Sequence, residues 1–168
     1  MEETMTMTRR LTVGAAAAAL IFVVTLFVKV PIPLGYANLG DGVIFLAAVF
    51  LPRKEAALAA AVGSALADLM GGFPVWIIPT LIIKYGMVEI VARTARDRTS
   101  WRAPSVILGW VLASVWDAAA YTLAGAAIYG SLAVGLTSLP ALSLSNVANM
   151  AAAYAAGFFV AGTRFFGK

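Results

Sequence analysis

The sequence predicts an all-α integral membrane protein, built as one bundle of six membrane-spanning helices. Of its 168 residues, 62% are hydrophobic and 12% are charged, whereas about 25% of the residues in an average soluble domain are charged. The mean hydropathy is +0.92. Apolar runs near the 20 residues that cross a bilayer recur along the chain. We therefore expect residues 1–168 to form a single multi-pass membrane domain.

Turn residues and charged clusters set the expected bounds of these helices, at residues 11–30, 42–51, 55–70, 79–95, 104–126 and 142–163. Pro79 falls in the first turn of its helix, where proline is tolerated. Residues 31–40 are expected to form a loop, and residues 128–140 a longer apolar loop that is partly helical. Because the second helix is short, the loop before it should dip into the membrane, where irregular backbone must be buried in protein or line a cavity.

Basic residues gather at alternate ends of the expected spans. They are Arg9, Arg10, Arg53, Lys54, Arg93, Arg96, Arg98, Arg102, Arg164 and Lys168. By the positive-inside rule, this end and both termini are cytoplasmic. Glu89 lies close to the same end, four residues before Arg93, and is expected to pair with it.

Composition excludes several classes of chemistry. The chain has no Cys and no His, so disulfides, thiol nucleophiles, Ser-His-Asp triads and the usual transition-metal sites are ruled out. It also has no phosphate-binding G-x-x-x-x-G-K-[ST] loop for hydrolysing ATP. The basic residues mark the ends of spans, so they do not indicate nucleic-acid binding. We expect no catalytic activity, no cofactor and no metal ion.

Polar side chains gather in the outer half of the membrane. At about 1.5 Å per residue from the basic end, Lys84 lies near the midplane, with the aspartates above it. Charged residues at such depth are functional by default, and several aromatic residues nearby could form flat walls. The candidate substrate-binding residues are Tyr36, Asn38, Asp41, Asp68, Trp76, Lys84, Trp116, Asp117, Tyr121, Asn146 and Asn149.

Other interpretations of these residues stay open. Tyrosine and tryptophan also collect at membrane interfaces, and asparagines also tie helices together. Asp68 and Lys84 could form a closed ion pair, or they could be two contacts at different levels of one pocket. Their counted depths differ by about 7 Å, which favours the second interpretation.

Small residues dominate the first half of the first helix. Gly14 with Ala18, and Ala15 with Ala19, have the spacing that lets helices approach closely in lipid. A run of five alanines is small on every side, so one face is available for another subunit. Residues 56–67 have a similar character and are expected to pack inside the bundle.

Three motifs, at residues 38–48, 63–76 and 79–84, together resemble the substrate-binding S component of energy-coupling factor (ECF) vitamin transporters. The similarity is greatest to the riboflavin-type branch, which includes transporters for pyridoxine-like and hydroxymethylpyrimidine-like compounds. The resemblance implies a prokaryotic cell-membrane protein that binds a vitamin from outside. It also implies a transmembrane coupling subunit and two cytoplasmic ATPase subunits as partners, with Ala15 and Ala19 as the docking site.

The polar groups favour a small heteroaromatic ring with hydroxymethyl groups, pyridoxine-like or hydroxymethylpyrimidine-like, with riboflavin next. Two other functions are considered. A stand-alone secondary transporter would need alternating access, for which no inverted repeat is evident. A membrane enzyme would use Asp41, Asp68 and Asp117 as metal ligands, but no metal-binding motif is present.

Overall fold

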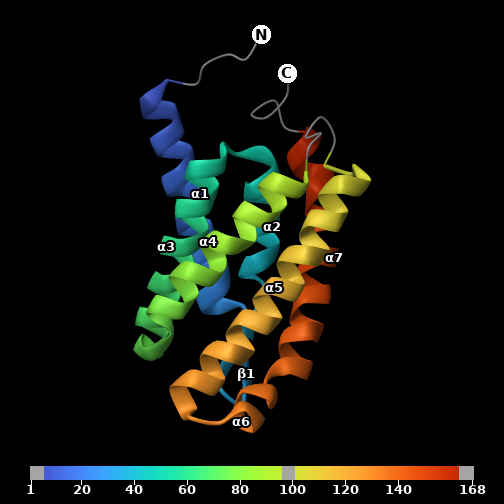
Figure 1. Cartoon of the computed structure of the whole chain (residues 1–168). Coiled ribbons are helices and arrows are strands. Elements are labelled where there is room, and N and C mark those ends of the chain that lie inside the picture. The colour runs from blue at the N-terminus through green and yellow to red at the C-terminus, as the bar shows by residue number, and fades with distance from the viewer. Residues whose placement is uncertain (1–5, 96–100, 163–168) are drawn as a thin grey trace.

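The computed structural model describes residues 6–95 and 101–162, which form an elongated helical bundle (Figure 1). Its elements in chain order are α1 (Met7–Phe27), β1 (Lys29–Ile32), β2 (Gly35–Asn38), α2 (Gly40–Phe50), α3 (Arg53–Gly71), the 3-10 turn η1 (Pro74–Trp76), α4 (Ile77–Thr94), α5 (Pro104–Tyr129), α6 (Leu132–Leu136) and α7 (Leu139–Gly162). The six expected helices are thus present in the described part of the chain. The loop at residues 128–140 is partly helical, as expected, because it contains α6.

Three of the described helices are long and apolar enough to cross a membrane on their own. They are α1, α4 together with η1, and α5. Helix α2 is apolar but has only 11 residues, which corresponds to about 16 Å and reaches about halfway through the hydrocarbon core. The chain before α2 must therefore enter the bundle to meet it.

The structure differs from the expected loop at residues 31–40, and from the expected end of the first helix at residue 30, because a short hairpin begins at Lys29. β1 and β2 form an antiparallel hairpin in which Lys29 pairs with Asn38 and Ile32 with Gly35. Pro31 lies in β1 although it has no backbone N–H to donate. In a two-stranded sheet every strand is an edge, and edge strands tolerate proline. The hairpin pairs the backbone groups of this segment, as burial requires.

Glycines end two of the helices in the left-handed conformation that favours this residue. Gly72 follows α3 with φ +86°, and Gly130 follows α5 with φ +70°. After Gly72, the Phe73 amide donates to the Asp68 carbonyl at 2.8 Å. This cap fixes the turn that leads into η1 and α4.

α1 and α3 pack so closely that one position between them must be glycine. A Cβ atom at Gly63 would lie 2.5 Å from the Ala18 carbonyl oxygen. The alanines around Gly63 are largely buried, among them Ala56, Ala60 and Ala67. The prediction that residues 56–67 pack inside the bundle is therefore confirmed.

Helices α1, α3 and α5 start, and α2, α4 and α7 end, at one end of the bundle (Figure 1), and the arginine–glutamate ion pairs of the described chain lie there. Arg10 pairs with Glu55 at 2.7 Å, and Glu89 pairs with Arg53 and with Arg93, the latter at 3.0 Å. The predicted Glu89–Arg93 pair is confirmed. Four of the basic residues used for the orientation, Arg96, Arg98, Arg164 and Lys168, lie outside the described residues.

Candidate functional site

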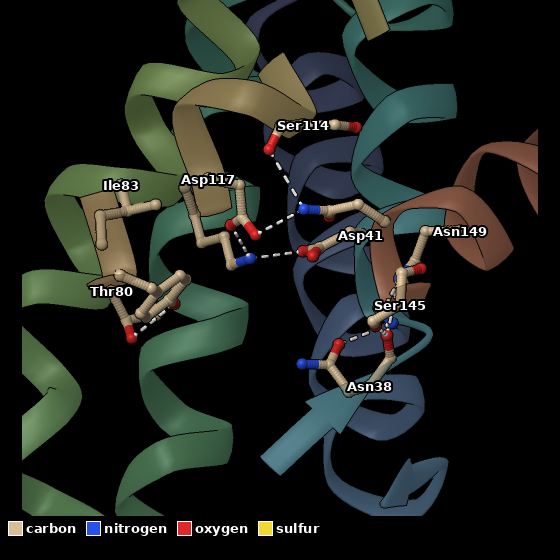
Figure 2. A network of polar contacts seen from close by, with 12 residues as sticks. Asn38, Asp41, Thr80, Ile83, Ser114, Asp117, Ser145 and Asn149 are labelled. Carbon is tan, nitrogen blue, oxygen red and sulfur yellow. Dashed lines mark hydrogen bonds and ion pairs between the residues drawn. The ribbon is translucent and has the colours of Figure 1, made fainter. Parts of the chain in front are cut away.

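The site is organised around the ammonium group of Lys84, which lies between two carboxylates from other helices (Figure 2). Its Nζ is 2.7 Å from Asp41 Oδ1 of α2 and 2.7 Å from Asp117 Oδ1 of α5. The third side of the ammonium faces the Tyr121 ring, whose centroid is 5.0 Å away. Lys84 is only 3% exposed. An ammonium buried to this extent is tolerated because opposite charges and hydrogen bonds surround it.

Asn146 of α7 holds the Asp117 carboxylate from its other side. Its Nδ2 donates to Asp117 Oδ2 at 3.2 Å and to the Ser114 carbonyl at 3.1 Å. With Lys84 on Oδ1 and Asn146 on Oδ2, both oxygens of Asp117 are engaged. The network therefore joins α2, α4, α5 and α7 through side chains.

Asp68 of α3 belongs to a second contact and is not the partner of Lys84. The Tyr36 hydroxyl of β2 donates to Asp68 Oδ1 at 2.6 Å, and the Lys29 ammonium lies 4.8 Å from the centroid of the Tyr36 ring. Burial, and next the Asp68 charge, raise the pKa of the Tyr36 phenol above its usual value. Tyr36 therefore keeps its proton at physiological pH. These contacts, and the pairing of Lys84 with Asp41 and Asp117, exclude the closed Asp68–Lys84 pair.

A cavity lies between these two polar groups and the hairpin. Nine of the predicted residues line it: Tyr36, Asn38, Asp41, Asp68, Trp76, Lys84, Asp117, Tyr121 and Asn146. The space open to the centres of water molecules is about 60 Å³, several times the roughly 10–15 Å³ that one water requires. The cavity therefore has room for a small ligand.

Aromatic rings form one wall of this cavity. The ring centroids of Trp76 and Tyr121 are 5.7 Å apart and tilted by 54°. The Tyr121 hydroxyl is 2.9 Å from the Thr80 hydroxyl, one helical turn before Lys84. Ring faces beside polar groups are typical of pockets for small aromatic ligands.

Four buried polar atoms of the lining find no hydrogen-bond partner among the described residues. They are Asp68 Oδ2, Trp76 Nε1, Ser64 Oγ and Thr25 Oγ1. All four residues are at most 7% exposed. Buried polar groups are normally satisfied, so these atoms are available to a ligand or to water: an acceptor on α3, a donor on η1 and two hydroxyls.

Two predicted site residues lie outside the cavity lining, and Trp116 is the first of them. It is 38% exposed, packs against Gly86 and donates from Nε1 to the Ile83 carbonyl at 3.0 Å. Trp116 therefore ties α5 to α4 from outside the cavity.

Asn149, the second, is fully buried but serves as a link between segments. Its Oδ1 accepts from the Gly42 amide at 2.7 Å, and its Nδ2 donates to the Asn38 carbonyl at 2.7 Å. It thereby joins the end of the hairpin and the first turn of α2 to α7.

Sequence reasoning missed several hydroxyl groups of the lining. Ser64 precedes Asp68 by four residues and Thr80 precedes Lys84 by four. Residues four apart lie on one face of a helix, so this spacing is a signal that could have found both. Thr25 of α1 and Ser138 before α7 also line the cavity, and no comparable signal points to them.

The three acids considered as metal ligands are held by other partners. Asp41 and Asp117 are bridged by Lys84, while Asp68 accepts from Tyr36. Within residues 6–95 and 101–162, no group of three His, Cys, Asp or Glu side chains is placed to hold a metal ion.

Comparison with known proteins places this site in context. The sequence model of a family described as "ECF-type riboflavin transporter, S component" matches residues 5–163. A protein from Pyrococcus woesei, described as an uncharacterized protein in the gap 3′ region, is 36% identical over 110 residues. That alignment covers 64% of this chain and 72% of the archaeal protein.

Proposed function

Because the chain belongs to the family of ECF-type riboflavin transporter S components, we propose that its cavity binds a heteroaromatic vitamin for uptake through an ECF complex. The observation that carries this proposal is the set of unpartnered polar atoms around a cavity with an aromatic wall. Such a cavity gains affinity from burial of a ring and orientation from a few polar contacts. The proposal assigns the nine lining residues named above to substrate binding.

The vitamin enters from the side of the membrane that carries the hairpin and α6. The cavity is lined by hairpin residues such as Leu34 and Tyr36 and by Ser138 before α7, whereas the charged clusters lie at the other end of the bundle (Figure 1). The positive-inside rule supports an inward basic end. We propose six membrane segments with both termini in the cytoplasm of a prokaryotic cell.

The face of α1 that carries Ala15 and Ala19 is proposed to dock the transmembrane coupling subunit. Both alanines are exposed, whereas Gly14 and Ala18 turn toward α3. The two overlapping small-residue pairs of the sequence thus lie on different faces of the helix. Energy would come from two ATPase subunits that associate with the coupling subunit.

Riboflavin is the first vitamin to test, since the family description names it. The preference for pyridoxine-like or hydroxymethylpyrimidine-like rings expected from the sequence gains no support from the family. It rests on the donors and acceptors of the cavity, and on the modest size of that cavity.

The test is calorimetric binding of riboflavin, pyridoxine and hydroxymethylpyrimidine to the purified chain in lipid nanodiscs. We expect one of them to bind stoichiometrically. If the folded chain binds none of the three, the proposed function is wrong. Uptake into vesicles by this chain without its partners would instead favour a stand-alone transporter.

A further inference from the structure

We propose that an aromatic–arginine cluster at the basic end of the bundle binds the phosphate headgroup of an anionic membrane lipid. The cluster consists of Trp101 and Arg102, just before α5, and of Tyr154 and Phe158 near the end of α7. None of these four residues lines the cavity, and the inference does not depend on the proposed function. It follows from the packing of the rings, the placement of the guanidinium group and the position of both relative to the bilayer.

Three aromatic rings of the cluster pack edge to face. The centroid of the Trp101 ring is 5.0 Å from that of Tyr154 and 5.0 Å from that of Phe158, and the latter two are 5.7 Å apart. Gly157 allows this packing, because a Cβ atom there would lie 2.8 Å from the Trp101 ring. Trp101 is 6% exposed, whereas Tyr154 is 43% and Phe158 49% exposed. The cluster therefore buries the indole and leaves two rings at the surface.

The guanidinium group of Arg102 lies against these rings. Its Cζ atom is 4.3 Å from the centroid of the Phe158 ring and 5.0 Å from that of the Trp101 ring, within the range of a cation–π interaction. These contacts hold the group in place, although Arg102 is exposed. A ring contacts the face of a guanidinium, whereas a phosphate accepts hydrogen bonds from the N–H groups in its plane. Arg102 can therefore bind a phosphate and keep its contacts with the rings.

The position of the cluster matches the boundary between lipid headgroups and acyl chains. Arg102 lies two residues before α5, a helix long and apolar enough to cross the membrane. The α7 surface beside the two exposed rings is apolar, since Ala155 is exposed and Phe159 is 80% exposed. Aromatic residues collect at this level of a bilayer, and basic residues there attract anionic lipids. An anionic lipid supplies both a phosphate for Arg102 and an apolar chain for the rings, whereas an acidic protein surface supplies only the charge.

The test is a competition between phosphatidylglycerol and phosphatidylcholine with the same acyl chains, in which native mass spectrometry counts the lipids retained by the purified full chain. We expect the wild type to retain the anionic lipid in preference by about fivefold, as for one basic residue near an anionic surface. Arg102→Gln should bring this ratio close to one. Arg9→Gln is the matched control, since it removes an exposed arginine from the same end of the bundle, and it should keep the ratio. Equal retention of both lipids by the wild type, or equal narrowing in both variants, overturns the inference.

A second variant separates a built site from charge alone. Phe158→Leu removes the ring that lies against the guanidinium but leaves the net charge unchanged, and it should narrow the lipid ratio. A wild-type ratio in the folded Phe158→Leu chain would contradict the role of the cluster. This variant decides the inference if Arg102→Gln does not fold, which thermal unfolding in phosphatidylcholine nanodiscs shows. If Arg102→Gln keeps the lipid ratio but no longer copurifies with the coupling subunit, the surface binds a protein, and the inference is wrong.

Discussion

Among single residues, Lys84 determines how the buried charges of this protein coexist. Its ammonium neutralises part of the charge of two carboxylates that approach from α2 and α5. Without it, Asp41 and Asp117 would share one buried region with no cation between them. Lys84 therefore stabilises the bundle in addition to shaping the cavity.

Replacing Lys84 should destabilise the fold as well as weaken binding. Lys84→Met keeps the length of the side chain but removes the charge, and we expect a loss of about 3–5 kcal/mol because the buried carboxylates lose their partner. Thermal unfolding in nanodiscs measures this loss. Lys54→Met, at an exposed lysine of the basic end, is the control and should unfold like the wild type. Wild-type stability of Lys84→Met would contradict the stabilising role of the ion pair.

Two tryptophans separate a cavity contact from a packing contact. Trp76 Nε1 has no partner among the described residues and lies in the lining, whereas Trp116 Nε1 donates to the Ile83 carbonyl outside it. Trp76→Phe should weaken vitamin binding by about 0.5–1.5 kcal/mol, the worth of one hydrogen bond. Trp116→Phe should lower stability by a similar amount and leave affinity unchanged. Calorimetry and thermal unfolding of both variants check this, and the reverse pattern would show that Trp116 faces the ligand.

Helix geometry explains why the sequence can identify the polar set but not every role within it. Counting along helices places the aspartates above Lys84 in the outer half of the membrane, and two of them, Asp41 and Asp117, do meet Lys84. Counting does not give the rotation of a helix about its axis. Trp116 and Asp117 are neighbours about 100° apart on α5, so both could not face the cavity. The pairing of Lys84 with Asp41 and Asp117, and not with Asp68, depends on how the helices are arranged side by side.

Among the elements, α1 has two different faces. Gly14 and Ala18 lie toward α3, where Gly63 allows the close crossing, while Ala15 and Ala19 are exposed. A run of alanines looks alike on every side, so the sequence alone does not distinguish these overlapping small-residue pairs. The position of α3 decides which of the two pairs is packed inside the bundle and which is exposed.

A bulky residue on the exposed face should block assembly and spare binding. Ala15→Trp and Ala19→Trp are expected to bind vitamin normally but to fail to copurify with the coupling subunit, because close helix contact needs small residues. Leu123→Trp is the control, at an exposed apolar position of α5. This variant should bind vitamin normally and should also copurify with the coupling subunit. If the α1 variants lose vitamin binding, or assemble normally, this face is not the docking surface.

The hairpin of β1 and β2 is an element that the sequence does not predict. Its strands have four residues each and include Pro31, so neither length nor composition indicates strands. The sequence predicts that the loop before α2 dips into the membrane and there is buried or lines a cavity, and Tyr36, Asn38 and Asp41 do line the cavity. The backbone pairing of the hairpin comes from tertiary burial and not from local propensity.

Over the whole molecule, the two ends of the bundle differ in the groups that they carry, which gives the bundle a polarity along its axis. Ion pairs of arginine with glutamate lie at one end, and the hairpin, α6 and the cavity lie toward the other. The distribution of basic residues along the sequence predicts this polarity. The proposed insertion in the membrane follows from it.

The natural absence of cysteine makes this orientation directly testable. A single cysteine at Thr137, exposed after α6, should react with a membrane-impermeant maleimide on intact cells. A single cysteine at Lys54, exposed at the start of α3, should react only after the cells are permeabilised. Labelling of Lys54→Cys on intact cells, with none of Thr137→Cys, would reverse the proposed topology.

The proposed function requires that a heteroaromatic vitamin occupy the cavity between Lys84 and the hairpin. Mass spectrometry of the small molecules released when the purified chain is denatured tests this requirement without assuming which vitamin is bound. Ser64→Leu, which extends a side chain from α3 into the lining, is the companion variant, and its unfolding temperature shows whether it is folded. We predict that the wild-type chain releases a vitamin in near-stoichiometric amount and that the folded variant releases little. Release of no such molecule after vitamin is supplied, or equal release from both proteins, would contradict the occupancy proposed for this cavity.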